Sequence, residues 1–328
     1  MPKVITYESP SNIALIKYWG KHGNQLPNNP SISFTLSNSK SISSIEYEKG
    51  KANIEFYFEN KRNLVFEKRI AVFINNNKEI LPFVDDYCLK ITSRNTFPHS
   101  AGIASSASAF SALALCLISI KQELAYDVEQ FEKEVSKLAR LGSGSAARSV
   151  YKGVVLWGKT ELESKSSNEF AIPINNKVHK IFNNYHDDII IVEKSTKSVS
   201  SSAGHSLMNT NPYRTEKYKQ SNLNLKNLLL ALKNGDLEQF IKITENEALS
   251  LHSMMMLSDP SFILIKPKTL EIINKIRNYR EKSKIPVCFT LDAGPNVHLL
   301  YPDKYSFEVQ KFTSEIKNVS IINDFMSF

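Results

Sequence analysis

The sequence predicts an α+β protein with two lobes, and three observations support this. Strand-like segments dominate the first eighty residues, helical patterns follow, and both kinds of segment return after residue 185. Clusters of strands that alternate with clusters of helices are typical of this class. We therefore expect antiparallel or mixed sheets packed against helices, with an N-terminal domain at 1–184 and a C-terminal domain at 185–328.

Strands are expected where apolar or β-branched residues alternate with polar ones between Asn, Gly and Lys turns. In the first lobe four segments fit this pattern: SISFTLS, KSISSIEYE, ANIEFYFEN and KRIAVFI. DDIIIVEK opens the second lobe as a strand, and strand patterns return in IPVCFTLDAGPNVHLLYP.

Helices are expected in four stretches with apolar spacing near 3.6 residues. They are ASSASAFSALALCLISIKQELA, DVEQFEKEVSKLARL before a Gly/Ser break, NLNLKNLLLALKNGDLEQFIKITENEALSLHSMM and KPKTLEIINKIRNYREKSK. The longest apolar run, residues 110–120, is far shorter than the ~20 residues of a membrane span. It predicts a buried helix in a soluble protein.

Composition narrows the class of protein. With 42% hydrophobic residues the chain can build a full core, and its net charge of +8 favours anionic partners. The three cysteines, Cys88, Cys116 and Cys288, are far apart and form no CxxC pair. This predicts neither a disulfide framework nor a zinc site, and it fits a reducing cytoplasm. The first residues lack the apolar run of a signal peptide.

The stretch SPSNIALIKYWGK, residues 9–21, contains Asn12, Lys17, Tyr18, Trp19 and Lys21. A strand that only fills a core rarely carries two lysines beside two large aromatic residues. The segment is therefore a candidate for holding a ligand.

FPHSAGIASSASA, residues 97–109, leads from a glycine and two adjacent serines into an apolar helix. Such a helix start presents unpaired backbone N–H groups where the helix dipole favours an anion. Ser105 and Ser106 add hydroxyl groups for phosphate oxygens or a metal-bound water. No G-K-[ST] follows, so this is not a Walker loop. Composition alone leaves phosphate binding and tight helix packing equally open.

LGSGSAARSVYKG, residues 141–153, places Ser143 and Ser145 between glycines and Arg148 shortly after them. The Ser-Gly-Ser backbone can approach a ligand closely, and arginine offers a planar fork for phosphate or carboxylate. We favour this function over a flexible surface connection, because glycine and serine alternate here just before a tyrosine and a strand.

Two further segments are ambiguous by themselves. KSTKSVSSSAGHSLMN, residues 194–209, has the serine content of a linker, and its His205 has no visible partner. FTLDAGPNVHLL places Asp292 after an apolar strand, either as a general base or charge stabiliser or as an Asx-turn residue.

The combination of three such loops, two lysines, one arginine and one carboxylate indicates phosphoryl transfer to an already phosphorylated small molecule.

NIALIKYWGK, FPHSAGIASSASAFSALA, LARLGSGSAARSVYKGVVLW and FTLDAGPN resemble, in this order, signature segments of the mevalonate diphosphate decarboxylase family of the GHMP kinase superfamily. The resemblance spans nearly the whole chain. It implies a two-lobed GHMP-kinase-type fold and a cytoplasmic enzyme, commonly a homodimer, with no nucleic-acid or membrane partner. The implied reaction uses ATP and Mg²⁺ to convert (R)-5-diphosphomevalonate, through 3-phosphorylation, to isopentenyl diphosphate, carbon dioxide, ADP and phosphate.

By position, the resemblance assigns catalytic roles to Asp292, Lys21 and Arg148. It places Asp292 near the 3-hydroxyl, Arg148 at the substrate's carboxylate or diphosphate, and Lys21 at the diphosphate. The other implied substrate contacts are Lys17, Tyr18, Trp19, Ser143, Ser145 and Ser201, the last on a lid. The implied nucleotide-phosphate contacts are Asn12, Gly102, Ser105 and Ser106, with Ser106 also near Mg²⁺.

Three positions depart from the family pattern. His205 stands where many relatives have methionine, Ser202 where some bacterial members have arginine, and Leu141 where relatives often have arginine. These changes leave open a phosphomevalonate decarboxylase or a mevalonate 3-kinase on the same scaffold. A basic RNA-binding protein is the alternative from another class, but the lysines are dispersed rather than gathered among aromatic residues.

Overall fold

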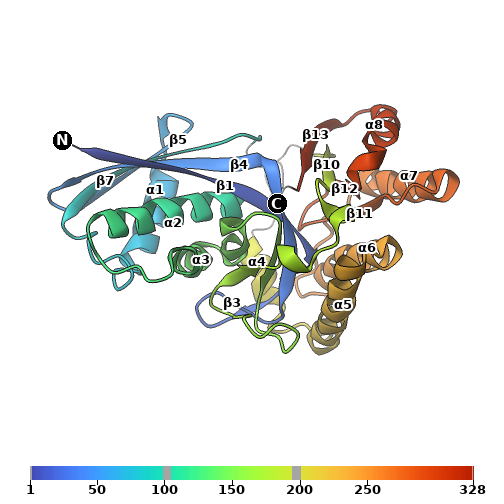
Figure 1. Ribbon diagram of the computed structural model, residues 1–328, viewed down its shortest axis with the longest axis horizontal. Coiled ribbons are helices and arrows are strands. Elements are labelled where there is room, and N and C mark those ends of the chain that lie inside the picture. Colours follow the sequence, from blue (N-terminus) through green and yellow to red (C-terminus); the bar gives the residue numbers. More distant parts are fainter. Residues whose placement is uncertain (1, 99–104, 194–200, 327) are drawn as a thin grey trace.

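The computed structural model describes residues 2–98, 105–193, 201–326 and 328, and its strands form two larger sheets with helices packed on them and one further sheet of two short strands (Figure 1). Within these residues the larger sheet has seven strands, in the order β6-β5-β7-β4-β8-β9 with β1 also paired to β4. The pairings are antiparallel except for β5 with β7. The α+β class with mixed sheets is confirmed. The strands are β1 (Lys3–Ile16), β4 (Ser31–Lys49), β5 (Asn53–Phe58), β6 (Lys61–Arg62), β7 (Tyr87–Asn95), β8 (Val154–Trp157) and β9 (Ala171–Pro173).

Strand β4 is a single strand of 19 residues where two strands were predicted. Its first part pairs with β8, its second part pairs with β7, and β1 follows its other edge. The polar residues between the two parts do not form a turn. Instead, the Asp324 carboxylate accepts the backbone N–H groups of Ser37, Asn38 and Ser39 at 2.7–2.9 Å.

The prediction of a strand at KRIAVFI is wrong, because this segment lies in helix α1 (Leu64–Asn75). Asn63 caps the helix by accepting a backbone N–H group of the first turn. Ile70, Phe73 and Ile74 are buried. Their spacing of three and four residues places them on one helical face, and this outweighs the β-propensity of the isoleucines and valine.

Helices α2 (Ser105–Glu123) and α3 (Phe131–Gly142) were predicted and are confirmed. Every residue of 110–120 except Leu115 is buried, as expected for a core helix. The 3-10 helix η1 (Gly144–Val150) follows α3 directly. Figure 1 shows α1, α2 and α3 gathered along the large sheet, with β1 and β4 running above α2.

The smaller sheet has four antiparallel strands in the order β11-β12-β10-β13. They are β10 (His186–Ile191), β11 (Cys288–Thr290), β12 (Val297–Tyr301) and β13 (Ser320–Phe325). The predicted helical stretches form α5 (Arg214–Asn234), α6 (Leu237–Met256) and α7 (Pro267–Ser283). The remaining elements are β2 (Lys21–His22), β3 (Leu26–Pro27), η2 (Asn175–Lys177), η3 (Lys180–Phe182), α4 (Ser201–Leu207), η4 (Asp303–Tyr305) and α8 (Ser306–Ser314).

The two lobes share one hydrophobic core. Phe34 of β4 stacks on Phe240 of α6, with ring centroids 5.9 Å apart, and both rings contact Phe182 and Tyr185. The predicted domain boundary at 184/185 falls inside this aromatic cluster and stays a prediction.

None of the helices in the described ranges combines the length and the apolar character that crossing a bilayer requires. Cys88, Cys116 and Cys288 are free thiols.

Candidate active site

Lys17 and Asp292 form an ion pair between the lobes. Strand β1 ends at Ile16, and Asp292 follows β11 by two residues. Lys17 Nζ lies 3.2 Å from Asp292 Oδ1, and only 2% of the lysine side chain is exposed. Burial lowers the pKa of Lys17, whereas Asp292 and then Glu247 oppose this by favouring the charged form. The structure therefore joins a lysine and an aspartate that are 275 residues apart.

Arg148 of η1 lies beside this pair and is also buried. Its Nε donates to Ser33 Oγ at 3.0 Å, and one terminal nitrogen donates to Ser31 Oγ at 2.5 Å. The other terminal nitrogen donates to Asn12 Oδ1 at 3.2 Å. Of the five N–H groups of arginine, these bonds use three, so two have no partner in the described part of the chain and are available to an anion. Burial lowers the pKa of Arg148 to about 10, which leaves the guanidinium charged near neutral pH.

Asn12 was expected to bind nucleotide phosphate, but the structure commits its amide to Arg148 and its surroundings. Its Oδ1 accepts from Arg148, while its Nδ2 donates to Ser149 Oγ at 2.7 Å and to the Ser145 carbonyl at 3.2 Å. The side chain is buried. Asn12 thus orients the guanidinium and the Ser-Gly-Ser segment.

Tyr18 presents a buried hydroxyl group with no hydrogen-bond partner in the described part of the chain. Its ring packs between Trp157 and His205, at 4.8 and 4.2 Å between centroids. Gly144 lies directly against the hydroxyl, where a Cβ would approach to 2.7 Å. A buried polar group without a partner usually indicates a missing water or ligand. The hydroxyl of Tyr18 therefore fits an absent substrate atom.

Lys21 and Trp19 face different surroundings. Lys21 donates to Gln25 Oε1 at 2.9 Å, and burial, followed by repulsion from Arg69, lowers the pKa of Lys21. Trp19 is buried in a hydrophobic cluster with Met208, Leu251, Met254 and Met255. The resemblance places both aromatic residues of this segment at the substrate, and for Trp19, whose ring packs in this cluster, that role stays a prediction.

His205 of α4 contacts the same segment. Its Nδ1 accepts the Gly20 backbone N–H at 3.0 Å, and its ring lies 4.8 Å from the Trp19 ring. Burial lowers the pKa of His205 to about 3, with smaller effects from Lys21 and Arg148. The imidazole is thus neutral.

The start of α2 meets the segment after α3. Ser106 Oγ lies 3.3 Å from Ser143 Oγ, so the first and second small-residue segments come together. Ser145 is half-buried beside them. Gly102 lies outside the described residues, and so does the side chain of Ser201, although its backbone begins α4.

Three residues near the site were missed by the sequence analysis. Glu247 and His252 of α6 contact Lys17 and Asp292, respectively. Arg140 of α3 is buried, contacts the Asn24 carbonyl and acts electrostatically on Tyr18. The available signals were polar residues in the apolar pattern of ENEALSLHSMM, and an arginine directly before Leu141.

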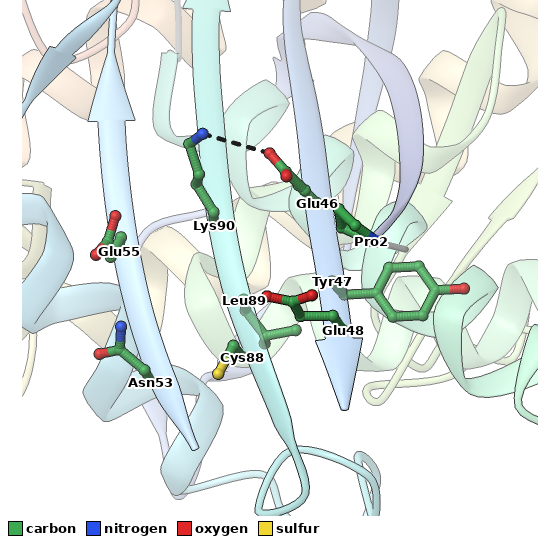
Figure 2. Close-up of a pocket in the computed structure, with 9 residues that line it drawn as sticks. All are labelled: Pro2, Glu46, Tyr47, Glu48, Asn53, Glu55, Cys88, Leu89 and Lys90. Atoms are coloured by element: carbon green, nitrogen blue, oxygen red, sulfur yellow. Dashed lines mark hydrogen bonds and ion pairs between the residues drawn. The ribbon is translucent and has the colours of Figure 1, made fainter. Parts of the chain in front are cut away.

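A hollow of about 250 Å³ lies elsewhere, on the face of the large sheet formed by β4, β5 and β7 (Figure 2). Figure 2 shows Glu46, Glu48 and Glu55 around it, with Lys90 paired to Glu46 at 3.3 Å. None of the candidate site residues lines this hollow.

The site brings together the buried Lys17 and Arg148, the half-buried Lys21 and the Asp292 carboxylate. Lys17, Lys21 and Arg148 suit a substrate with several negative charges, and Asp292 can accept a proton. The described residues contain no group of three or more His, Cys, Asp or Glu side chains that could hold a metal. Mg²⁺ usually keeps several waters and binds through one or two protein oxygens and substrate phosphates, so the hydroxyl pair Ser106–Ser143 fits a metal that arrives with a nucleotide.

The fold and the site together place the protein in the GHMP-kinase-fold class. Its structural neighbours belong to the same class. The family model "Diphosphomevalonate decarboxylase-like N-terminal domain" matches residues 9–168, and "Mevalonate 5-diphosphate decarboxylase C-terminal domain" matches residues 188–326. The chain belongs to the mevalonate diphosphate decarboxylase family.

Individual relatives cover almost the whole chain. The diphosphomevalonate decarboxylase of Ganoderma lucidum is 29% identical over 93% of this chain and 80% of its own length. A crystal structure of a mevalonate diphosphate decarboxylase from Legionella pneumophila is 30% identical, with a TM-score of 0.83 over 98% of this chain and all of that one. The solved complex of MDDEF with MVAPP, AMPPCP and magnesium is 28% identical, with a TM-score of 0.84 over all of this chain and 98% of that one.

Proposed function

We propose that this chain catalyses the ATP-dependent decarboxylation of (R)-5-diphosphomevalonate to isopentenyl diphosphate, carbon dioxide, ADP and phosphate. The observation that carries the proposal is the buried Lys17–Asp292 pair beside Arg148. The family membership and the ligands of MDDEF, which are MVAPP, an ATP analogue and magnesium, support the same reaction.

Asp292 acts in the first step by accepting the proton of the tertiary 3-hydroxyl. The hydroxyl oxygen then forms a bond to the γ-phosphorus, and the bond from that phosphorus to ADP breaks. Lys17 keeps the Asp292 carboxylate ionised and in place, because its ammonium group lies 3.2 Å from Oδ1. A positioned acid or base of this kind contributes about 10²–10⁴-fold to the rate.

Arg148 acts in the second step by holding an anionic end of the substrate with its two unused N–H groups. The C3–O bond breaks as the new phosphate leaves, and the C1–C2 bond breaks as carbon dioxide leaves. The electron pair of that second bond forms the double bond of isopentenyl diphosphate. Asn12, Ser31 and Ser33 fix the orientation of the guanidinium through hydrogen bonds.

The diphosphate of the substrate is assigned to Tyr18, Lys21, Ser143 and Ser145. The unpartnered hydroxyl of Tyr18 donates to a phosphate oxygen, and Lys21 supplies the charge. Ser201, at the start of α4, is assigned to the lid over the substrate.

The nucleotide phosphates are assigned to Gly102, Ser105 and Ser106 at the start of α2. Ser106, with Ser143 at 3.3 Å, would hold Mg²⁺ together with the phosphates. When bound, the metal ion neutralises charge on the transferred phosphoryl group.

The resemblance also supports a cytoplasmic homodimer with a domain boundary at 184/185. Light scattering coupled to size-exclusion chromatography would give a mass near twice that of one chain for a dimer, and the mass of one chain would contradict it.

A product assay tests the proposed function. Mevalonate, its 5-phosphate and its 5-diphosphate are offered separately with Mg·ATP, while carbon dioxide, ADP and free phosphate are followed together. We expect all three products in equal amounts from the diphosphate only. ADP without carbon dioxide would instead indicate a 3-kinase, and a preference for the 5-phosphate would indicate a phosphomevalonate decarboxylase.

A further inference from the structure

Helix α6 contacts both members of the Lys17–Asp292 pair. We propose that Glu247 and His252 are positioning residues. From this one helix they hold Lys17 and Asp292 at a fixed distance from each other. The inference rests on the proposed function, because it concerns the group that accepts the proton of the 3-hydroxyl.

The first contact is made by Glu247, which is completely buried. Its Oε2 accepts the backbone N–H of Lys17 at 3.0 Å, at the point where β1 ends. Its Oε1 accepts from Lys217 Nζ at 2.9 Å and from Asn224 Nδ2 at 2.7 Å. The carboxylate is thus fixed by α5 from one side, and it fixes the backbone of Lys17 on the other.

The second contact is made by His252, which is also buried. Its Nε2 lies 3.0 Å from the backbone carbonyl oxygen of Asp292. A carbonyl only accepts, so Nε2 carries the proton and donates it. Burial lowers the pKa of His252 to about 4, which leaves the ring neutral at the pH of the reaction. Nδ1 has no partner among the described residues, so within them the imidazole makes its hydrogen bond to Asp292 alone.

One rigid element therefore sets the distance between two segments of different lobes. Glu247 and His252 are five residues apart, which corresponds to about 7.5 Å along a helix. The ion pair that they hold joins the end of β1 to the turn after β11. Misplacement of a reacting group by about 1 Å can cost about 10²-fold in rate, so a fixed spacing of this kind bears on turnover.

Glu247 also acts on the charge of Lys17. The charged or titratable groups that face this lysine from the surrounding elements are Asp292, Glu247, Arg148 and His252, with Lys217 paired to Glu247. Asp292 and Glu247 favour the ammonium form, whereas burial and Arg148 favour the neutral amine. Removing the charge of Glu247 therefore lowers the pH at which Lys17 loses its proton.

The first test replaces Glu247→Gln and uses Glu245→Gln as a matched control. Glutamine keeps one acceptor oxygen for the Lys17 N–H, but it removes the charge and replaces the other carboxylate oxygen by an NH2 group. Glu245 lies on the same helix but pairs with Arg280 and Arg277. We expect Glu247→Gln to lower kcat about 10–100-fold with little change in KM, and to move the alkaline limb of the kcat profile to lower pH. Glu245→Gln should leave that limb in place.

A second substitution controls for a folding defect in Glu247→Gln. Glu247→Gln leaves the buried Lys217 without its charged partner, which destabilises the fold. The double variant Glu247→Gln/Lys217→Met removes both charges together. We expect it to fold and to show the same movement of the alkaline limb. If the alkaline limb of the kcat–pH profile lies at the same pH in the double variant as in the unmodified enzyme, the role assigned to Glu247 is wrong.

The second test concerns His252. Glutamine can place an amide N–H near the position of Nε2, whereas leucine cannot donate. We expect His252→Leu to lower kcat about 10–100-fold at nearly unchanged KM, and His252→Gln to recover at least part of this loss. Equal losses in both variants would show that the ring acts only through packing and would overturn its assigned role.

A measurement without turnover separates this inference from the proposed function. The ¹⁵N resonance of the Lys17 ammonium group, titrated in the substrate-free protein, should show an earlier deprotonation in Glu247→Gln than in Glu245→Gln. Equal midpoints would overturn the inference even if the unmodified enzyme releases carbon dioxide. Failure of the unmodified enzyme to release carbon dioxide would contradict the proposed function instead.

Discussion

Lys17 has a fully buried ammonium group whose charge depends on its neighbours. An isolated ion in such surroundings would shift its pKa and become neutral. Asp292, 3.2 Å away, and Glu247 oppose this shift. The lysine and the aspartate therefore stabilise each other's charged forms, which keeps the carboxylate available as a proton acceptor.

The role assigned to Asp292 is tested by Asp292→Asn. We expect kcat to fall about 10²–10⁴-fold, because the amide cannot accept the proton, while ATP binding stays near normal. Steady-state kinetics and nucleotide titration would measure both quantities. Asp303→Asn is the matched control, since Asp303 is exposed and pairs with His186. A fall of less than about threefold for Asp292→Asn would remove Asp292 from the chemistry.

His205 provides a test by pH. Its folded pKa of about 3 is below the unfolded value near 6.5, so the unfolded chain binds an additional proton below pH 6.5. The free energy of unfolding therefore falls as the pH decreases from 6.5 toward 3, by about 1.4 kcal/mol per pH unit for this residue. We expect His205→Met to remove this part of the fall.

Thermal unfolding between pH 7.5 and 5 measures the effect. The melting temperature of His205→Met should decrease less with acidification than that of the unmodified protein, whatever the two values are at neutral pH. His22→Gln, at an exposed histidine, should follow the unmodified protein. Parallel decreases for His205→Met and the unmodified protein would mean that His205 is not held neutral.

At the scale of elements, β4 and α1 differ from the structures that their local sequence patterns predict. The residues around Asn38 have the composition of a turn, yet Asp324 from the other end of the chain satisfies their backbone N–H groups. The segment KRIAVFI has β-branched residues, yet its burial follows helical spacing. For β4 a partner distant in the sequence decided the structure, whereas for α1 the helical spacing of the buried residues within the segment did.

Asp324→Ala should destabilise the fold through β4. The substitution removes the acceptor of three backbone N–H groups of β4 and of the Phe325 N–H, and each unsatisfied buried donor costs about 1–3 kcal/mol. Since Ser39 is buried and Asn38 is exposed, we expect a total loss of at least ~2 kcal/mol in urea unfolding. The exposed Asp303→Ala should change stability by less than about 0.5 kcal/mol. Similar values for the two variants would contradict the role of Asp324.

At the scale of the whole molecule, the shared core of Phe34, Phe182, Tyr185 and Phe240 couples the two lobes. The active site lies on the same junction, because β1 carries Lys17 and the second lobe carries Asp292 and α6. Folding of the site therefore depends on the packing of the two lobes against each other.

Phe240→Ala tests this coupling. Phe240 is fully buried on α6, and its truncation should cost about 3–5 kcal/mol. Trp157, in the first lobe, reports the unfolding of that lobe by fluorescence, in a Trp19→Phe background that removes the other tryptophan. We expect the Trp157 transition to move to lower denaturant concentration. A transition that stays in place would show that the lobes unfold independently.

The sequence by itself determined the α+β class, most helices and the chemistry-bearing segments, because helical periodicity and small-residue motifs are local properties. It placed Asp292, Arg148, Lys21 and the serines of the two loops among the candidates, and their roles stay predictions. Only the tertiary structure decided that Lys17 pairs with Asp292, that Trp19 packs in the core, and that Asn12 orients Arg148. It also revealed Glu247 and His252, whose partners lie far away in the chain. The physical reason is that the cost of burying a charge, and the partner that offsets it, depend on contacts between distant segments, which no local pattern contains.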